Sequence, residues 1–184
     1  MKIQKAPFTT LFPVPAVAVT SQGKSGPPNV MAIAWVGTVC SDPPMVSISI
    51  RPGRHSHALI KETGQFVINI PREDQARELD ICGSVSGSKA DKFALTGWTP
   101  VPAAKVKAPL IAELPVNIEC EVRQVISLGA HDLFLAEILA VHMDESVLDE
   151  GRLDFSKMRP FAYNNAEYWS MKEKIGQYGF TKKE

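Results

Sequence analysis

A short run of cationic and hydroxyl side chains is the first candidate for a binding site; it comprises Arg51, Arg54, His55, Ser56 and His57. Ser56 has the side chain of a helix N-cap, and the residues after it predict a short helix over 57–63 that Gly64 ends. A helix N-terminus offers N–H groups and a partial positive charge, so a phosphate group fits there. A capped surface helix beside solvated charges explains the same residues. Both interpretations remain open.

Two lysines offer a second source of positive charge for the same anion. Lys89 and Lys92 follow the small-residue loop 83–88, and Ser88 is a candidate cap for a further short helix. The loop contains two glycines, but the Gly-Lys-Ser/Thr ending is absent and no strand leads into it, so it is not a Walker motif. Solvated lysines are the plainer interpretation.

Metal binding and cysteine chemistry have little support in the pattern. His55 and His57 are two residues apart, so on a helix they point in different directions, and no other ligand type stands at a companion spacing. Cys40 lies in a turn where no neighbour is of the kind that lowers a thiol pKa, which favours a small, partly buried side chain. Cys120 belongs to the apolar face of a strand, and the sequence assigns no role to Cys82.

His131 is the most suggestive single histidine in the chain. It lies in the turn 129–132, which reads Gly-Ala-His-Asp and joins two long predicted strands over 114–128 and 133–143. A histidine in such a turn is more often structural or solvated than catalytic.

The stretch 29–56 must position most of these groups. Residues 29–35 are apolar on both faces, which predicts a strand that is covered on both sides. Gly37 and Thr38 interrupt the run and predict a bulge or a close approach of the backbone to a ligand. Residues 46–51 alternate, so that Ser47, Ser49 and Arg51 share one face. A wall for a polar ligand and a plain hairpin both fit this pattern.

The remaining pattern predicts a mainly β fold with helical additions. Further strands are expected over 16–21 and 65–70, and a helix over 73–81. These elements favour an antiparallel barrel over a doubly wound parallel sheet, because long helices do not alternate with the strands. We expect one domain over 1–184, with an extended N-terminal arm over 1–15 and an aromatic C-terminal tail that packs at a subunit interface.

Composition limits the choice of partners and location. Hydrophobic residues make up 45% and charged residues 22% of 184, and twenty basic side chains balance twenty acidic ones. This balance argues against a nucleic acid or a membrane surface as partner. No apolar run approaches the roughly 20 residues of a bilayer span, and no signal peptide is apparent. Three cysteines without a close pair indicate free thiols in a reducing cytoplasm.

An ordered set of short segments covers nearly the whole chain. The segments are NVMAIAW (29–35), GTVCS (37–41), PP (43–44), RP (51–52), HSH (55–57), KETG (61–64), FVINI (66–70), SG (86–87), DKF (91–93), GAHD (129–132), RPFAY (159–163) and YW (168–169). This set resembles the flavin reductase-like, FMN-binding split-barrel family, and within it the flavoredoxin branch.

The resemblance implies a homodimer of split barrels that holds FMN without a covalent bond in a groove near the dimer interface. It implies that residues 35–41 line the isoalloxazine edge. Ser56, with Arg51 or His57, would hold the phosphate or ribityl chain, and Lys89 or Lys92 would add charge. The expected cofactor-binding set is Asn29, Trp35, Val36, Gly37, Thr38, Val39, Cys40, Ser41, Arg51, His55, Ser56, His57, Lys89, Lys92 and Phe93.

The resemblance also implies a redox function. His131 matches a position near the nicotinamide side of flavin reductases, although its turn reads Gly-Ala-His-Asp where many reductases have Gly-Asp-His. Three readings follow. The chain is an NAD(P)H:flavin oxidoreductase with NADH or NADPH as donor, an electron carrier that a redox partner protein reduces, or a split barrel that binds another ligand. Electron transfer through FMN needs no acid–base residue from the protein.

Overall fold

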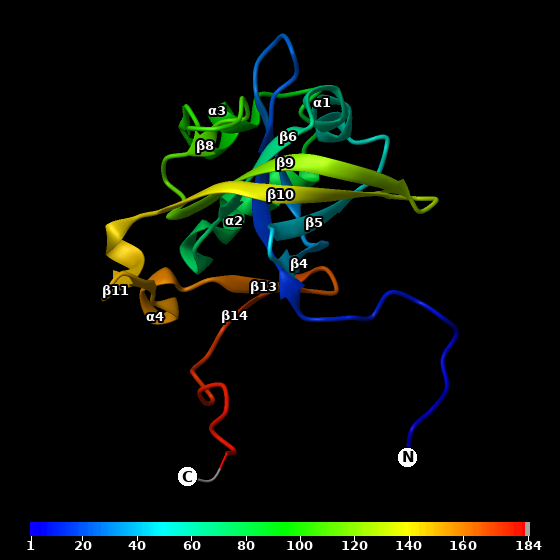
Figure 1. Cartoon of the computed structure of the whole chain (residues 1–184). Helices are drawn as coiled ribbons and strands as arrows, with labels where there is room; N and C mark the ends of the chain where they lie inside the picture. Colours follow the sequence, from blue (N-terminus) through cyan, green and yellow to red (C-terminus); the bar gives the residue numbers. More distant parts are fainter. Residues whose placement is uncertain (183–184) are drawn as a thin grey trace.

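Seven antiparallel strands form the central sheet in the order β3-β2-β6-β9-β10-β5-β4 (Figure 1). The structure is a computed structural model that describes residues 1–182. The strands of this sheet are β2 (Val17–Ser21), β3 (Asn29–Ile33), β4 (Val36–Ser41), β5 (Pro44–Ile50), β6 (Gln65–Ile70), β9 (Val116–Ser127) and β10 (Asp132–Met143).

The sheet closes on itself because its two edge strands are consecutive in the chain. β3 and β4 lie at opposite ends of the strand order, yet only Ala34 and Trp35 separate them. Three Cα–Cα steps span about 11 Å at most, so the two edges must meet. The Trp35 carbonyl accepts a hydrogen bond from the Ser49 N–H at 2.9 Å, which ties this connection to β5. The expected antiparallel barrel is confirmed.

The barrel encloses one hydrophobic core. Alternate residues of the strands point inward, among them Val19, Ile48, Phe66 and Phe134, and each of these four side chains is fully buried. Ile60 from α1 (His55–Thr63) closes one end of this core. The alternation of side chains along each strand therefore determines which residues face the interior of the barrel.

Helices and loops cover the outer face of β2 and β3. The short helices α2 (Ala76–Ser84) and α3 (Lys92–Thr96) contribute Leu79, Cys82 and Phe93 to a second apolar cluster, which Trp98 completes. Because β2 is covered on both faces, all five of its residues are buried. The other elements are β1 (Val14–Pro15), η1 (Glu73–Gln75), β7 (Pro100–Val101), β8 (Leu110–Ile111), η2 (Glu145–Val147), β11 (Leu148–Asp149), β12 (Arg152–Leu153), α4 (Phe155–Met158), β13 (Phe161–Asn164) and β14 (Glu167–Ser170).

Several expected boundaries were wrong. The strand expected over 29–35 ends at Ile33, and Gly37 and Thr38 lie inside the separate strand β4, whose bulge falls between Thr38 and Cys40. The helix expected over 73–81 begins as the 3₁₀ turn η1 and continues as α2 to Ser84, which takes the first two residues of the expected loop 83–88.

Both expected serine caps were wrong as well. α1 begins at His55 with Arg54 as N-cap, so Ser56 lies inside its first turn. α3 is capped by Asp91, whose carboxylate accepts from the Phe93 and Ala94 N–H groups, rather than by Ser88. An Asp cap satisfies two N–H groups here, which explains why it outcompetes the earlier serine.

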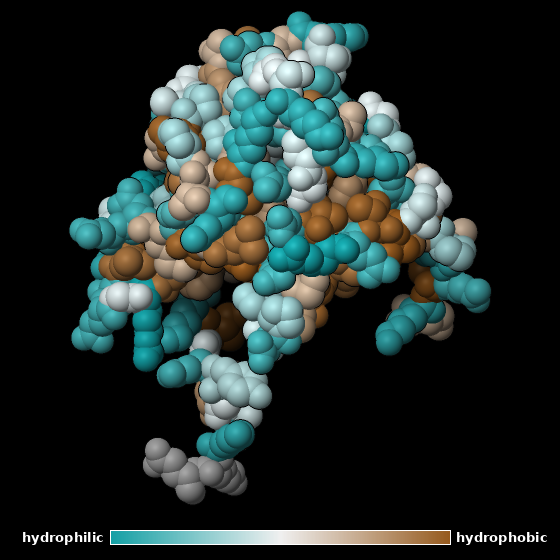
Figure 2. Space-filling view, turned by 45° about the horizontal axis from the view of Figure 1, so that its top comes forward, coloured by the Kyte–Doolittle hydropathy of each residue, from teal (hydrophilic) through white to brown (hydrophobic). Residues whose placement is uncertain are grey.

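The two ends of the chain leave the barrel on the same side (Figure 1). Residues 1–13 contain no strand or helix, and Phe8 and Leu11 are exposed. The tail packs as far as β14, since Phe161 of β13 is buried in the second cluster, whereas Ile175 and Phe180 are exposed. Figure 2 shows hydrophobic atoms gathered in a band across the middle of one face. Within residues 1–182 no helix has the length and apolar character to cross a bilayer.

Candidate functional site

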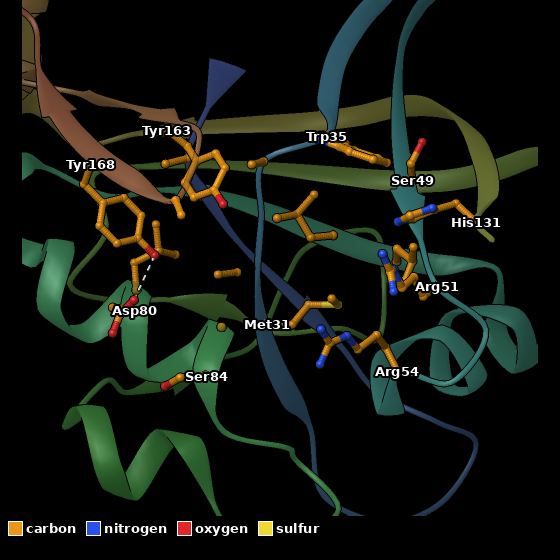
Figure 3. Close-up of a pocket in the computed structure, with 18 residues that line it drawn as sticks. Met31, Trp35, Ser49, Arg51, Arg54, Asp80, Ser84, His131, Tyr163 and Tyr168 are labelled. Carbon is orange, nitrogen blue, oxygen red and sulfur yellow. Dashed lines mark hydrogen bonds between the residues drawn. The ribbon is translucent and has the colours of Figure 1, made fainter. Parts of the chain in front are cut away.

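A two-part groove lies where β3, α2, the β13–β14 hairpin and the N-terminus of α1 meet, and Figure 3 shows its wide part. Its wide part has a volume of about 500 Å³ and its narrow part about 110 Å³. Met31, Ala32, Arg54 and Gly83 line both parts, so the two are continuous.

The wide part has an apolar floor and two different walls. Ala32, Ile33 and Ala34 form the floor beside Leu79 of α2. One wall carries Arg51, Arg54 and His131, and the opposite wall carries Tyr163, Tyr168 and Asp80 (Figure 3). A flat apolar slot with polar groups at its rim fits an aromatic ring system with polar edges.

The tyrosine wall is fixed to α2 by one hydrogen bond. The Tyr168 hydroxyl donates to Asp80 Oδ1 at 3.2 Å. Partial burial, with the Asp80 charge as the next contribution, raises the pKa of Tyr168 to about 12. The phenol therefore stays protonated and remains a donor at neutral pH.

The narrow part is formed around the first turn of α1. This helix has no side-chain cap and no acidic residue in its first turn, so its N-terminal partial positive charge is not neutralised locally. Ser56 is buried, and its Oγ accepts a hydrogen bond from Asn29 Nδ2 at 2.7 Å. The hydroxyl proton of Ser56 can therefore be donated into the pocket.

Lys92 adds a buried cation to the narrow part. It is 5% exposed, and its Nζ donates to the Cys82 carbonyl at 2.7 Å. Burial lowers the pKa of Lys92, and the nearby Arg54 guanidinium lowers it further. An anion in this pocket would relieve the cost of burying the ammonium group, because buried charges are stable only when paired.

His131 and Trp35 stack at the far end of the wide part. Their ring centroids are 4.6 Å apart with the planes tilted by 39°. Desolvation and the positive charge of Arg51 lower the pKa of His131. The imidazole is therefore neutral at pH 7 and can donate or accept a hydrogen bond.

The structure brings together seven of the residues that the sequence suggested. The ones that line the groove are Asn29, Trp35, Arg51, His55, Ser56, Lys92 and His131.

The other expected residues lie outside the groove of this chain. The edge strand β4 pairs with β5 and contributes none of its residues to the lining of the groove; these residues are Val36, Gly37, Thr38, Val39, Cys40 and Ser41. Lys89 is exposed outside the pocket lining, and Phe93 is part of the second apolar cluster.

His57 also turns away from the groove. Its Nε2 pairs with Asp132 Oδ2 at 2.8 Å, and both residues are buried. Adjacent residues on an α-helix point about 100° apart, so Ser56 can face the pocket while His57 faces the barrel and Asp132. The hydrogen bond from His57, with a smaller contribution from Ser127, lowers the pKa of Asp132.

Sequence reasoning missed several lining residues. Tyr163 and Tyr168 were assigned only to a packing tail, and Asp80 to the face of a helix. The signals for the two tyrosines were the aromatic content of the tail and the segments RPFAY (159–163) and YW (168–169), but neither assigned them to a binding site. Among residues 1–182 no group of three or more His, Cys, Asp or Glu side chains is arranged to hold a metal ion.

Comparison with known proteins identifies the family. Two flavoredoxin structures match over 98% of this chain. That of Desulfovibrio vulgaris (Miyazaki F) has 35% identity, a TM-score of 0.91 and 98% of its own chain covered. That of Methanosarcina acetivorans has 30% identity, a TM-score of 0.92 and 97% covered. The FMN reductase (NADH) RutF of Stutzerimonas stutzeri is 27% identical over 128 residues, which are 70% of this chain and 71% of that protein.

A family model gives the same result over most of the sequence. The model described as flavin reductase like domain matches residues 9–172. The ordered motifs, the split barrel and these matches agree, and the chain belongs to the flavin reductase-like family, with flavoredoxins among its similar structures.

Proposed function

We propose that this chain binds FMN non-covalently in the two-part groove and acts as an oxidoreductase that passes electrons through the flavin. The observation that carries the proposal is the shape and chemistry of the groove. A wide apolar slot leads into a narrow cationic pocket, as a flavin ring followed by a phosphate chain requires.

The residues present fit this cofactor. Ser56, Lys92, Arg54 and the N-terminus of α1 supply a hydroxyl donor, two cations and a helix dipole for a phosphate. Ala32 to Ala34 supply an apolar surface for the ring. FMN, when bound, would supply a ring that takes up and releases electrons.

The protein's own part is to bind, orient and exclude water. The tyrosine wall and the apolar floor cover the slot from two sides. The pair of Trp35 and His131 marks the end at which an electron donor or acceptor approaches, and a neutral His131 orients that molecule by hydrogen bonding rather than by charge.

We further propose that the functional form is a homodimer. Trp35 at the groove and Val39 of β4 are exposed apolar side chains, and the apolar side chains of the two chain ends are also exposed in the single chain. Residues of β4 that do not line the groove of their own chain are then available to a partner subunit.

Two versions of the function differ in the source of electrons. As an NAD(P)H:flavin oxidoreductase the chain would accept electrons from NADH or NADPH, an activity that the similarity to a protein named FMN reductase (NADH) supports. As an electron carrier it would be reduced by a partner protein, which the similarity to two flavoredoxins supports.

A purification followed by a spectrum tests the proposal. The purified protein should be yellow, or colourless but able to bind added FMN and quench its fluorescence. Anaerobic mixing with NADH or NADPH then separates the versions, since rapid bleaching indicates a reductase and a stable spectrum indicates a carrier. A chain that neither carries nor binds FMN would refute both.

A further inference from the structure

The loop between α2 and α3 approaches Asn29 so closely that a side chain at one of its positions would displace the Asn29 carboxamide. A Cβ atom on Gly87 would lie 2.0 Å from Asn29 Oδ1, 2.6 Å from Cγ and 3.0 Å from Nδ2. These separations are shorter than any van der Waals contact, so the carboxamide and a side chain at 87 cannot both keep their places.

The loop itself has little freedom to withdraw. Ser86 Oγ and Ser88 Oγ are 2.9 Å apart, and the Ser86 carbonyl accepts hydrogen bonds from the Lys89 and Ala90 N–H groups at 3.0 and 3.3 Å. Two residues later Asp91 begins the cap of α3. Of the two partners, the Asn29 side chain is therefore the one that would move.

Asn29 is also the residue that orients the Ser56 hydroxyl. It is 6% exposed at the first position of β3, and its Nδ2 donates to Ser56 Oγ at 2.7 Å. With one lone pair used by this bond, the Ser56 proton points elsewhere, and Ser56, Gly87 and Lys92 all line the narrow pocket.

We infer that Gly87 is a positioning residue for the anion end of the groove. Because it lacks a side chain, the loop seats against the Asn29 carboxamide, and Asn29 holds the Ser56 hydroxyl as a donor to the phosphate of the ligand. This inference rests on the proposed function, since it takes the anion to be the phosphate of FMN.

Gly87→Ala tests the inference, with Lys89→Ala as the control. Lys89 lies two residues after Gly87 in the same loop, but it is exposed and outside the lining of both parts of the groove. Gly87→Ala should weaken FMN binding about tenfold or more, as expected for loss of a hydrogen bond to a charged group. Lys89→Ala should leave FMN affinity within about twofold of wild type.

Riboflavin separates positioning from general damage, because it lacks the phosphate. Gly87→Ala should reduce the ratio of FMN affinity to riboflavin affinity, whereas a variant that merely loosens the fold weakens both ligands equally. Isothermal titration of the flavin-free protein with each ligand gives both constants, and a thermal melt of the flavin-free protein reports the fold.

A double-mutant cycle with Asn29→Ala tests the route through the carboxamide. Asn29→Ala removes the group that clashes and the donor to Ser56, so it should lower the FMN to riboflavin ratio by itself. Gly87→Ala in that background should have no further effect. If Gly87→Ala fails to fold alone, the Asn29→Ala background still permits the comparison.

The outcomes separate the two claims. A wild-type chain that binds no flavin overturns the proposed function. A wild-type chain that prefers FMN to riboflavin, together with a Gly87→Ala ratio equal to the wild-type ratio or with fully additive effects in the cycle, overturns only the role of Gly87.

Discussion

Ser56 and His57 are neighbours in α1, yet their side chains lie in different environments. The Ser56 hydroxyl lies in the narrow pocket, whereas the His57 ring packs edge-on against Phe134 with centroids 5.3 Å apart and pairs with Asp132. Of the basic cluster in the sequence, Arg51, Arg54, His55 and Ser56 therefore line the groove, and His57 alone has a structural role.

His57→Gln should lower stability without weakening FMN binding, because His57 holds the start of β10 and lies outside the groove. The hydrogen bond depresses the pKa of Asp132 in the folded state. Its contribution is therefore present above the unfolded pKa of about 3.9 and is lost as pH falls through the folded value. Urea unfolding should give a lower free energy of unfolding for the variant than for wild type at pH 7. This difference in free energy should be smaller at pH 3.

The complementary control is flavin titration of the same variant. An FMN affinity reduced tenfold by His57→Gln would contradict the division of roles within α1.

At the scale of elements, the polar face of β9 shows what covers the barrel. Because residues alternate along β9, Asn117 and Glu119 lie on the strand face that points away from the barrel core. Both are nevertheless buried, under the loop that precedes β8. Glu119 accepts N–H donors from Ala104, Lys105 and Val106 and from the ring of His142. Burial by itself raises the pKa of Glu119, but these hydrogen bonds together lower it below its ordinary value.

Glu119→Gln should destabilise the fold by about 3 kcal/mol, because an amide N–H₂ would face donors that have no other partner. Glu121→Gln, on the same strand but partly exposed, is the matched control and should change stability by less than about 0.5 kcal/mol. The ionised Glu119 side chain stabilises the fold above its unfolded pKa of about 4.3. Denaturant unfolding should therefore show that the difference in free energy of unfolding between wild type and Glu119→Gln becomes smaller below that pH. Equal effects of the two substitutions at pH 7 would refute the role of Glu119.

Helices and strands could be predicted from the sequence where neighbouring residues alone mark them. The short apolar run of β6, the alternation of β9 and the breaks at Pro71 and Gly129 suffice to mark those strands. The sequence could not show that β3 ends at Ile33, because residues 34 and 35 continue its apolar run. Nor could it show the tyrosine wall, which depends on contact between Tyr168 and Asp80, 88 positions apart.

At the scale of the whole molecule, the closure of the sheet explains the position of the groove. The two-residue connection between the edge strands places Trp35 beside His131 at the mouth of the wide part. Both chain ends leave the barrel with apolar side chains exposed, which supports a second copy of the chain as their partner.

Replacing Ile175, Tyr178 and Phe180 together by serine should weaken the proposed dimer, because these side chains are 94%, 101% and 71% exposed in the single chain. Light scattering should give twice the 20.1 kDa chain mass for wild type and a lower mass for the variant. Replacing Lys172 and Lys174 by serine is the control and should leave the mass unchanged. A wild-type protein that is monomeric at micromolar concentration would exclude the dimer.

The central claim is that the narrow pocket holds the phosphate of FMN, and one titration tests it most directly. The double variant Ser56→Ala, Lys92→Ala removes a hydroxyl donor and a buried cation, so its FMN affinity should fall by at least about a hundredfold. Lys89→Ala removes a cation from the exposed loop nearby, outside the lining of the groove, and should bind FMN like wild type. An unchanged FMN affinity in the Ser56 and Lys92 variant would contradict the account.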